Sequence, residues 1–552
     1  MRFDFSQGHL GQGFQPVPPP PQPRRAIVLG GGMSGLLAAR VLADHFDQVT
    51  VIDRDGALLT AGVGPRSGAP QGDHVHVLLA KGLELMERWF PGLTAALDRA
   101  GAPTVDWTAD CRMMGLGGWN PRFVSGLTTR TCSRNLLESL LRDRLGAYPQ
   151  IEILAGLRVE GLVMAPPQNS AHGSDNDGGG AMGGGFAPIA GVRVRRGDQR
   201  QILAADLVID ATGRGSQTPQ WLEELGYGRP PEQRVDARLG YASRWYQRPD
   251  SPEGTGDRDW KALLLWAKPP HHRRAGVLYP VEGDRWVVTV SGVGGDYPPA
   301  DAAGFDEFLG SLRDRAIHDA TRNATPLGEP KLYRGTANRW RRYDRLKHFP
   351  QGLIVTGDAV CAFNPLYGQG MTAAALGAEL LETALQRSQP RDRGKAPTHR
   401  PLNLRALDRH FRPAIARALH LPWLMATGED LRWPSTEGAT PSPLTRLLQR
   451  YLEQVLLRTD RAPLLHETVW RVQHMVASPL ALLHPRILLR AFGNWGRPPA
   501  TPHGPQRPPH PAPPADRPRA LAIAPMAPPP TNQAPPLPMP LPMPFPLPSH
   551  PR

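Results

Sequence analysis

The chain has 552 residues, of which 40% are hydrophobic and 21% charged, so it is long enough for two or three domains with ordinary cores. No apolar run approaches the roughly 18–20 residues of a membrane-spanning helix, and the N-terminus lacks the basic start and apolar stretch of a secretory signal. Cys111, Cys132 and Cys361 lie far apart and predict neither a disulfide framework nor a cysteine-rich metal site, so we expect a cytoplasmic protein.

The formal net charge of +14 is compatible with nucleic acid or an anionic surface as a partner. Only six of the 64 basic residues are lysines, and the arginines are scattered and mostly interleaved with acidic residues. No basic stripe with stacking aromatic residues occurs, and no nucleic-acid motif. The charge therefore indicates a compositional bias toward arginine, and we expect no nucleic-acid partner.

Three segments have compositions that cannot bury enough apolar surface to offset the entropy lost on ordering. Residues 1–23 contain a run of prolines, residues 166–188 are polar and glycine-rich, and residues 496–552 are dominated by proline. We expect a disordered arm, a disordered loop and a disordered tail.

A glycine-rich turn follows the first apolar strand. The turn contains Gly30, Gly32 and Gly35 with the spacing GxGxxG. Gly30 permits a tight turn, Gly32 lets a pyrophosphate approach the backbone, and Gly35 lets the next helix pack closely on the strand. A second strand ends at Asp53, whose carboxylate can accept hydrogen bonds from ribose hydroxyls. The complete pattern predicts a dinucleotide site, with the phosphates at the helix N-terminus.

The next elements have less specific patterns. Residues 134–145 predict an amphipathic helix, and a hairpin interrupted by the glycine-rich loop follows it. Residues 206–216 (DLVIDATGRGS) predict a buried strand that ends at Asp210 and a loop that contains Gly213. Taken alone, this second motif is an ordinary exit from a strand.

Residues 237–292 alternate or run apolar and are rich in aromatic residues, which predicts an antiparallel sheet with a turn at 282–284. Tryptophans recur along it. They either line an apolar substrate cavity or form ordinary sheet core and cross-strand pairs. The tryptophans on this sheet are Trp245, Trp260, Trp266 and Trp286, and the candidates for a substrate pocket are Trp245, Trp266 and Trp286.

A third motif occupies residues 352–371. A buried strand leads to Gly357 and Asp358, and the loop before the next helix contains Pro365, Gly368 and Gly370. Glycine at these places removes side chains where a flat ring would lie against the backbone, and an acid near a sugar chain can accept its hydroxyls. We expect a ligand at this loop, with the following helix directing its positive end toward it.

Residues 404–492 are predicted to be mainly helical. Residues 464–492 mix apolar stretches with arginines, as interfacial helices do, but Pro479 and Pro485 divide the segment into short pieces. We expect a packed helical cap and weak membrane association at most.

Together, the three motifs resemble those of FAD-dependent monooxygenases of the aromatic hydroxylase and squalene epoxidase superfamily. The first is similar to the adenine-dinucleotide fingerprint of that superfamily, the second to the strand that closes over the cofactor, and the third to the glycine-aspartate motif that holds the ribityl chain. The resemblance is closer still to bacterial flavin epoxidases that act on polyether-precursor polyenes. The segments that carry it are 65–82 (PRSGAPQGDHVHVLLAKG), 208–216 (VIDATGRGS), 285–292 (RWVVTVSG) and 357–371 (GDAVCAFNPLYGQGM).

This resemblance implies an α/β fold, in which a Rossmann-like FAD-binding domain carries an inserted antiparallel-sheet substrate domain and a C-terminal helical region. The expected FAD-binding domain is in three parts, 24–90, 131–225 and 349–400. The expected remainder is a substrate-side segment 91–130, the sheet domain 226–348 and the helical region 401–495.

The resemblance also implies cofactor contacts. Asp358 would hold the ribityl chain, Arg134 would lie on the phosphate or ribose side, and Arg66 and Gln71 would face the flavin. The loop that ends at Met371 would lie near the isoalloxazine. The full expected set is Gly30, Gly32, Gly35, Asp53, Arg54, Arg66, Gln71, Arg134, Gly213, Asp358, Pro365, Gly368, Gly370 and Met371.

One departure concerns the electron donor. Aromatic hydroxylases carry aspartate-glycine in the second motif, a pair associated with both FAD and NADPH, and Thr212–Gly213 stands in its place here. No second nucleotide fingerprint is present. The expected ultimate reductant is NAD(P)H, with a separate flavin reductase as an alternative route for the electrons.

The implied activity is that of a monooxygenase, an epoxidase or hydroxylase that uses molecular oxygen. It would insert one oxygen atom from a flavin C4a-hydroperoxide into a hydrophobic polyene, polyketide or terpenoid-like substrate. The flavin carries this chemistry, so no catalytic side chain is expected. The alternatives are an FAD-dependent reductase of prenyl-type C=C bonds and an FAD-bearing scaffold that acts through its proline-rich tail. A flavin halogenase is less favoured because the GWxWxIP signature is missing.

His74 and His76 raise the question of a metal site. Two residues apart on a strand they would share a face, but no third ligand stands near them in the sequence. We therefore expect no metal, and a role for these histidines in shaping the flavin pocket or in packing.

Overall fold

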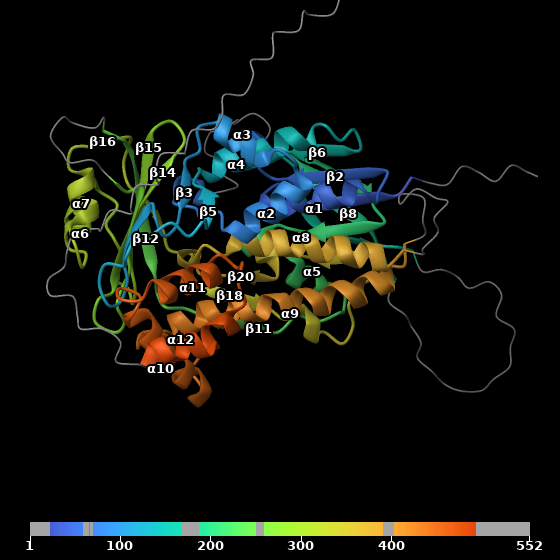
Figure 1. Ribbon diagram of the computed structural model, residues 1–552. Helices are drawn as coiled ribbons and strands as arrows, with labels where there is room; N and C mark the ends of the chain where they lie inside the picture. Colours follow the sequence, from blue (N-terminus) through green and yellow to red (C-terminus); the bar gives the residue numbers. More distant parts are fainter. Residues whose placement is uncertain are drawn as a thin grey trace, which may run out of the picture. The chain divides into compact units, whose positions relative to one another are not determined.

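The computed structural model describes residues 23–58, 66, 70–166, 187–249, 259–389 and 402–492, which all belong to one compact unit. Apart from a few edge residues, the segments predicted to be disordered lie outside the described residues, so their disorder stays a prediction. The described part of the chain contains α-helices, one parallel sheet, several small antiparallel sheets and a larger sheet that is antiparallel apart from one parallel strand pair (Figure 1). This confirms the predicted α/β fold class.

A five-stranded parallel sheet carries the glycine-rich turn. Its strands are apolar because helices or sheets cover both faces, as is typical of parallel sheets. Because all five strands run the same way, their carboxyl ends meet at one edge. In sheet order the strands are β19 (Leu353–Val355), β10 (Leu207–Asp210), β1 (Arg25–Leu29), β2 (Gln48–Asp53) and β6 (Ile151–Ala155).

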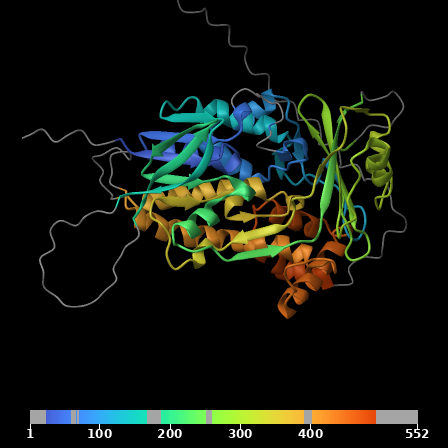
Figure 2. The same cartoon turned by 180° about the vertical axis from the view of Figure 1, so that it is seen from behind.

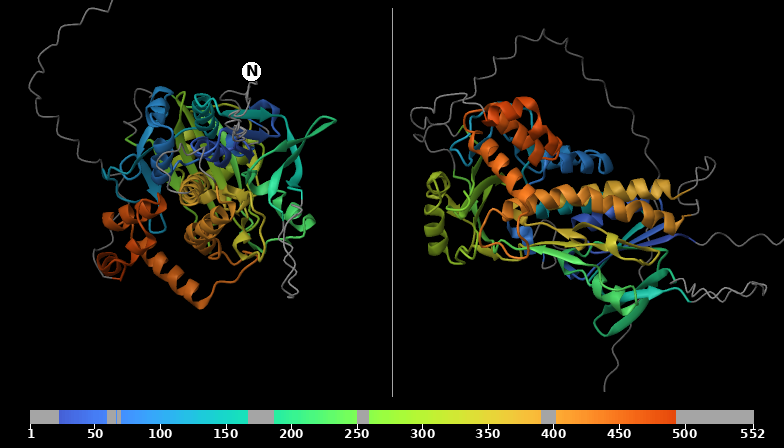
Figure 3. Two further views of the ribbon diagram at one scale, coloured as in Figure 1. Left: turned by 90° about the vertical axis from the view of Figure 1, so that its right-hand side faces the viewer. Right: turned by 90° about the horizontal axis from the view of Figure 1, so that it is seen from below.

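Helices pack against this sheet. The helix α1 (Met33–Ala43) contacts α8 (Gly370–Arg387), which contacts α9 (Leu404–Asp430) along its length, and Figure 3 shows α8 and α9 running side by side. The helix α9 includes Pro413 and Pro422 without ending at either. The other helices of this region are α2 (Ala80–Trp89), α3 (Leu93–Arg99), α4 (Arg134–Leu145) and α5 (Thr218–Glu224).

The close approach of α1 to β1 depends on Gly35. A Cβ atom at this position would lie 1.8 Å from the backbone oxygen of Gly30, so no other residue fits without moving the helix. The role predicted for this glycine from the sequence, close packing of the helix on the strand, is confirmed.

The predicted hairpin forms a small sheet of its own. The strands β7 (Arg158–Met164), β8 (Ile189–Arg196) and β9 (Gln199–Ala204) pair antiparallel in chain order. The strand β7 also contacts β2 of the parallel sheet, which brings the small sheet beside the end of β2 (Figure 2).

The aromatic-rich segment forms most of a seven-stranded sheet, with β17 paired to β12 beside the path β16-β12-β15-β14-β13-β4. The turn at 282–284 joins β14 to β15, as predicted. The helices α6 (Ala302–Gly310) and α7 (Ala316–Thr321) cover one face. The strands are β4 (Cys111–Met114), β12 (Gly240–Gln247), β13 (Ala262–Leu265), β14 (Arg274–Val281), β15 (Arg285–Gly292), β16 (Thr325–Pro326) and β17 (Lys331–Tyr333).

Two small sheets connect these parts. The strands β3 (Thr104–Asp106) and β5 (Thr128–Arg130) form a pair, and the other sheet has three strands. The latter matters for the site because its strand β20 leads directly into the loop of the third motif. Its members are β11 (Glu232–Val235), β18 (Asn338–Arg341) and β20 (Cys361–Ala362).

The C-terminal region is helical, as predicted, and Pro479 and Pro485 begin separate elements. Several large apolar side chains are exposed here, from 62% at Leu447 to 72% at Leu480. Within the described ranges, no helix is both long and apolar enough to cross a membrane. The elements are α10 (Pro443–Leu457), α11 (Pro463–Gln473), the 3-10 helix η8 (Pro479–Leu483) and α12 (Pro485–Phe492).

Candidate functional site

A cavity of about 990 Å³ lies at the carboxyl edge of the parallel sheet. Its lining combines the glycine-rich turn, the loop after β10, the loop before α8 and one face of the seven-stranded sheet. The volume stands at the upper end of the range of about 300–1,000 Å³ that is common for small-molecule sites. The cavity is therefore large enough for a dinucleotide and not only for a small substrate.

The first glycine turn is shaped by close backbone contacts. Gly30 has φ +98°, and a Cβ there would lie 2.6 Å from the backbone oxygen of Ala211 on the neighbouring strand end. At Gly32, the nearest atom to such a Cβ is Nη2 of Arg134 at 3.7 Å, so the turn is open toward the cavity. The Asp53 carboxylate accepts hydrogen bonds from the Gly31 amide at 2.6 Å and the Asp55 amide at 2.8 Å. Asp53 thus fixes the turn while it lines the cavity.

Arg134 belongs to a buried ionic network below this turn. It donates from Nε to Glu138 at 2.8 Å and from Nη1 to Gln71 at 3.2 Å. Gln71 in turn donates to the hydroxyl of Tyr333 at 2.9 Å. Glu138 also accepts from Arg66 at 2.5 Å. The network joins α4, the segment after β2 and the seven-stranded sheet around the middle of the cavity.

Glu138 holds this network together. Its side chain is 1% exposed, and although burial opposes ionisation, the positive charges of Arg134 and Arg66 and their hydrogen bonds hold the pKa of Glu138 below its usual value. The guanidinium of Arg66 forms its ion pair with Glu138, and Asp55 lies 3.9 Å from it. Arg66 does not line the cavity, so the sequence-based expectation that it faces the flavin finds no support in its position.

The loop after β10 is tied down by a buried carboxylate. Asp210, which is fully buried, accepts from the amide and hydroxyl of Thr212 and from the hydroxyls of Ser216 and Thr218. Gly213, at φ +75°, lies beside the cavity. A Cβ atom added at Gly213 would lie 3.9 Å from the Cβ of Asp358, so the second and third motifs are in close contact here.

Arg214, which sequence reasoning missed, joins the second motif to the third. It donates to the carbonyl oxygens of Ala337 and Phe363, and its Nε lies 3.8 Å from a carboxylate oxygen of Asp358. The ion pair is long, and no residue of the described ranges donates a hydrogen bond to the Asp358 carboxylate. The Asp358 carboxylate therefore has acceptor capacity left for a ligand in the cavity.

The loop before α8 presents backbone to the cavity. Pro365, Gly368, Gly370 and Met371 all line it. Gly368 has φ +66°, and a Cβ at Gly370 would meet nothing within 4 Å. The glycines thus leave the open space that a flat ring against the main chain requires.

One orphaned polar atom also points to a polar ligand. The hydroxyl of Ser34, in the first turn of α1, is buried and has no hydrogen-bond partner among the described residues, yet Ser34 lines the cavity. Buried hydroxyls rarely stay unpaired. Together with the open glycines and Asp358, this atom fits a bound dinucleotide with a pyrophosphate at the start of α1.

The seven-stranded sheet supplies the opposite wall. Its cavity face carries side chains from neighbouring strands at directly paired positions, such as Val277 opposite Thr289 and Ala275 opposite Ser291. Five hydroxyl-bearing residues stand on this wall. They are Tyr241, Tyr279, Thr289, Ser291 and Tyr333.

None of the three tryptophans expected in a substrate pocket lines the cavity. Trp286 lies on the other face of the sheet, in the core with α6 and α7, and stacks on Trp260. Side chains alternate between faces along a strand, and on β15 the cavity face has odd numbers. Trp245 and Trp266 pack against the core on the cavity side, where the indole of Trp245 donates to the Asp73 carbonyl at 2.8 Å. The pocket assignment of these tryptophans is not supported.

The two histidines have separate partners. His74 contacts the Ser243 hydroxyl at 2.8 Å through Nδ1, and burial lowers the pKa of His74 to about 4. His76 lines the cavity, and burial and the charge of Arg134 lower the pKa of His76 to about 3. Since the His74 carbonyl can only accept, Nδ1 of His76 donates to it at 2.9 Å. His76 is thus a neutral imidazole whose Nε2 carries the lone pair.

A row of arginines stands at the cavity end beside β2. Arg158, Arg195 and Arg200 pair directly across β7, β8 and β9, and all three line the cavity. Like charges opposite one another destabilise a sheet. Glu160 offsets part of this repulsion, at 2.8 Å from Arg195 and 2.9 Å from Arg200. This end of the cavity therefore has a strongly positive potential that suits a ligand with phosphate groups.

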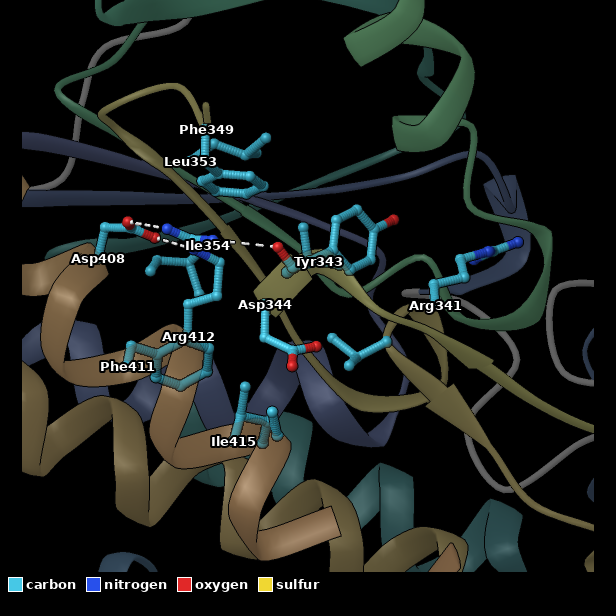
Figure 4. Close-up of a pocket in the computed structure, with 13 residues that line it drawn as sticks. Arg341, Tyr343, Asp344, Phe349, Leu353, Ile354, Asp408, Phe411, Arg412 and Ile415 are labelled. Carbon is cyan, nitrogen blue, oxygen red and sulfur yellow. Dashed lines mark hydrogen bonds and ion pairs between the residues drawn. The ribbon is translucent and has the colours of Figure 1, made fainter. Parts of the chain in front are cut away.

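A second cavity, drawn in Figure 4, is too small for a comparable role. It has a volume of about 20 Å³ between α9 and the end of β19, which is room for about one water molecule. Arg412 crosses it, donating to Asp408 at 2.8 and 2.9 Å and to the Tyr343 carbonyl at 3.1 Å. The bond to Tyr343 attaches α9 to the segment that leads to β19.

The structure thus brings most of the expected cofactor residues into one cavity and leaves two outside it. Gly35 acts in helix packing and Arg66 binds Glu138. The expected residues that line the cavity are Gly30, Gly32, Asp53, Arg54, Gln71, Arg134, Gly213, Asp358, Pro365, Gly368, Gly370 and Met371.

Comparisons with known proteins agree with this arrangement. No family model matches the chain. The protein Rv3254 of Mycobacterium tuberculosis is 32% identical over 440 residues, which cover 76% of this chain and 82% of that protein.

Solved structures with the same fold are flavin-dependent enzymes. PqsL of Pseudomonas aeruginosa, described as a probable FAD-dependent monooxygenase, superposes with a TM-score of 0.51 at 16% identity over 74% of this chain and 97% of PqsL. The flavin-dependent halogenase CmlS superposes with a TM-score of 0.52 at 17% identity over 83% of this chain and 77% of CmlS. At these identities the likeness shows the fold, and the more specific resemblance to polyether-precursor epoxidases stays a prediction.

We predict that Glu138→Gln destabilises the fold strongly, because it replaces the buried carboxylate that Arg66 and Arg134 share by a neutral amide, and only the longer contact of Arg66 with Asp55 at 3.9 Å remains. Breaking one side of a buried ion pair costs about 3–5 kcal/mol. The control is Glu382→Gln, which breaks the half-exposed pair with Arg88 at 2.7 Å and should cost about 0–1 kcal/mol. Urea unfolding of the two variants and the wild type measures both differences.

The difference in free energy of unfolding between wild type and Glu138→Gln should also depend on pH. Glu138 titrates at a lower pH in the folded than in the unfolded protein, so its stabilising contribution is present above the unfolded value of about 4.3 and is lost as the pH falls through the folded-state pKa. The stability difference between wild type and Glu138→Gln should therefore shrink in acid. A difference that stays constant down to acidic pH would contradict the assigned network.

Proposed function

Because this chain belongs to the family of the mycobacterial protein Rv3254 and has the fold of FAD-dependent monooxygenases and flavin-dependent halogenases, we propose that it is an FAD-dependent monooxygenase. The observation that carries the proposal is the single cavity in which a pyrophosphate-type glycine turn, the Asp358 carboxylate with acceptor capacity left and an open glycine loop face a separate sheet wall. The first three features suit FAD, and the wall leaves room for a second molecule beside its ring.

Different residues would bind the different parts of FAD. The turn at Gly30 and Gly32, with the N-terminus of α1, would bind the pyrophosphate, and Asp53 would accept from the adenosine ribose. Asp358 would accept from the ribityl chain, and the Gly368–Gly370 loop would lie against the isoalloxazine. When bound and reduced, FAD supplies the activation of molecular oxygen that side chains cannot provide.

The overall reaction consumes one molecule of oxygen and two electrons. One oxygen atom enters the substrate and the other leaves as water, while NAD(P)H and a proton supply the two electrons and two protons. The chain's own residues bind and orient the two molecules and exclude water from the ring. Thr212 stands where aromatic hydroxylases carry aspartate, so we propose a separate flavin reductase as an alternative donor to direct reduction by NAD(P)H.

The substrate wall refines the substrate class. Ala275 and Val277 are apolar, but Tyr241, Tyr279 and Ser291 also line the cavity, and no described residue hydrogen-bonds to their hydroxyls, whereas Thr289 bonds to Ser243 and Tyr333 to Gln71. Such hydroxyls stay unpaired against a pure hydrocarbon, which costs binding energy. We therefore propose an unsaturated polyketide- or terpenoid-like substrate that carries oxygen atoms of its own, in preference to a hydrocarbon polyene.

We predict that Asp358→Ala weakens FAD binding by about 10- to 150-fold, since charge-assisted hydrogen bonds contribute about 1.5–3 kcal/mol and each 1.4 kcal/mol is tenfold in affinity. Titration of the apo-protein with FAD, followed by flavin fluorescence, measures the effect. The matched control is Asp306→Ala on α6, a carboxylate that is 56% exposed and outside the cavity. Equal dissociation constants for wild type and Asp358→Ala would show that Asp358 is only a loop anchor.

The reaction type is tested by gas uptake and product mass. With NAD(P)H, alone or with an added flavin reductase, the protein should consume oxygen in the presence of an oxygenated polyene and yield a product heavier by one oxygen atom. Saturation of the substrate under anaerobic conditions would favour a reductase of prenyl-type bonds, and a halide-dependent product would favour a halogenase. Bound FAD without oxygen uptake from any reductant would favour the scaffold, whose proline-rich tail lies outside the described residues.

A further inference from the structure

A buried carboxylate outside every recognised motif holds the loop of the third motif. Asp430 is the last residue of α9, more than fifty residues beyond that loop in the sequence, and it is 1% exposed. It accepts from Nδ2 of Asn338 at 2.6 Å, from Nδ2 of Asn364 at 3.1 Å and from the hydroxyl of Tyr367 at 2.6 Å. No arginine, lysine or histidine forms an ion pair with it within the described part of the chain.

These bonds attach both ends of one short turn. The 3-10 helix η6 (Pro365–Tyr367) has Asn364 as its N-cap, and Gly368 ends it at φ +66°. Asn364 precedes the turn and Tyr367 is its last residue, so the Asp430 carboxylate holds both its start and its end. Pro365 and Leu366, which lie between the two attachment points, line the cavity.

The attachment is reinforced on both sides. The Asn364 amide donates to Oδ1 of Asn338 at 2.7 Å, which closes a ring of bonds between β18, the loop and α9. The Tyr367 carbonyl accepts from Gln473 on α11 at 2.8 Å. The C-terminal helices thus help to determine where the backbone of the loop lies.

We propose that Asp430 is a positioning residue that sets the backbone of residues 363–370 against the flavin ring, and that the charge of its carboxylate determines how firmly this backbone is held. The inference rests on the proposed function, because it requires that the cavity holds FAD. Asp430 touches neither cofactor nor substrate and acts through Asn364 and Tyr367.

The charge of Asp430 depends on pH in the relevant range. Burial raises the pKa of Asp430 to about 7, against the three hydrogen bonds that lower it. The other titratable groups that act on it or on its partner Tyr367 are Glu429 on the same helix, which raises the pKa of both, and Arg432, which acts on Tyr367. Asn338, Asn364 and Gln473 on the remaining neighbours are neutral.

Protonation has opposite effects on the loop and on the fold. Three neutral donors surround Asp430, and charge-assisted bonds are roughly twice as strong as neutral ones, so adding a proton weakens the hold on the turn. The folded-state pKa lies above the unfolded value of about 3.9, so protonation favours the folded state, and stability from this group is lost as the pH rises through about 7. Flavin affinity should thus fall, while this contribution to stability grows, as the pH drops below neutrality.

The test compares FAD dissociation constants and flavin absorption spectra of the wild type, Asp430→Asn and Tyr367→Phe between about pH 6 and 8.5, a range that brackets the raised pKa. We expect Asp430→Asn to weaken FAD binding at least tenfold at the upper pH, to change the fine structure of the flavin spectrum and to abolish the pH dependence of affinity seen in the wild type. Tyr367→Phe keeps both asparagine bonds and should weaken binding several-fold, and the double variant should bind no worse than Asp430→Asn.

The matched control is Asp106→Asn. Asp106 is also a buried carboxylate, 7% exposed, and it accepts from the amides of Thr108 and Gly126 away from the flavin loop. This variant should lose stability with an FAD affinity that stays close to that of the wild type.

The outcomes separate the inference from the function on which it rests. Wild-type affinity, spectrum and pH dependence in Asp430→Asn would overturn the role of Asp430 and leave the proposed function intact. If Asp430→Asn does not fold, unchanged FAD affinity and pH dependence in Tyr367→Phe would overturn it equally. A wild-type protein that binds no FAD would overturn both.

Discussion

The adjacent parallel pairing of β19, β10 and β1 is the constraint on which the site depends. These strands come from distant parts of the chain, yet in a parallel sheet their carboxyl ends meet at one edge, where open α/β sheets bind ligands. The turn after β1, the loop after β10 and the loop that follows β19 therefore converge. Gly30 shows how tightly, because a Cβ there would collide with the backbone of Ala211 at the end of β10.

Around this edge, buried carboxylates hold the loops and the arginine side chains in place through hydrogen bonds. Asp53, Asp210 and Glu138 each accept several hydrogen bonds and hold, respectively, the first turn, the second loop and the arginines below the cavity. Asp210 and Glu138 are satisfied by the protein, whereas Asp53 and Asp358 line the cavity, and Asp358, to which no described residue donates a hydrogen bond, retains the most acceptor capacity for a ligand. Carboxylates with acceptor capacity left at the cavity wall suit a ligand that carries hydroxyl groups.

The sequence was sufficient to predict the parts whose signal is local. The glycine spacing, the acids Asp53 and Asp358 after buried strands and the turn at 282–284 each reflect a few neighbouring residues, and the structure places Gly30, Gly32 and both acids at the cavity. It was not sufficient for partners far apart in the chain. Arg66 precedes Glu138 by 72 positions, and Asp430 follows Asn364 by 66. The face of Trp286 was missed because alternation along β15 does not reveal which face α6 and α7 cover.

The central claim is that the cavity holds FAD, and identification of the cofactor in the purified protein tests it most directly. The account predicts a yellow protein that releases one FAD per chain on heat denaturation, as measured by absorbance and mass spectrometry of the released compound. Release of FMN, of tightly bound NAD without flavin, or failure of the apo-protein to take up FAD would contradict it.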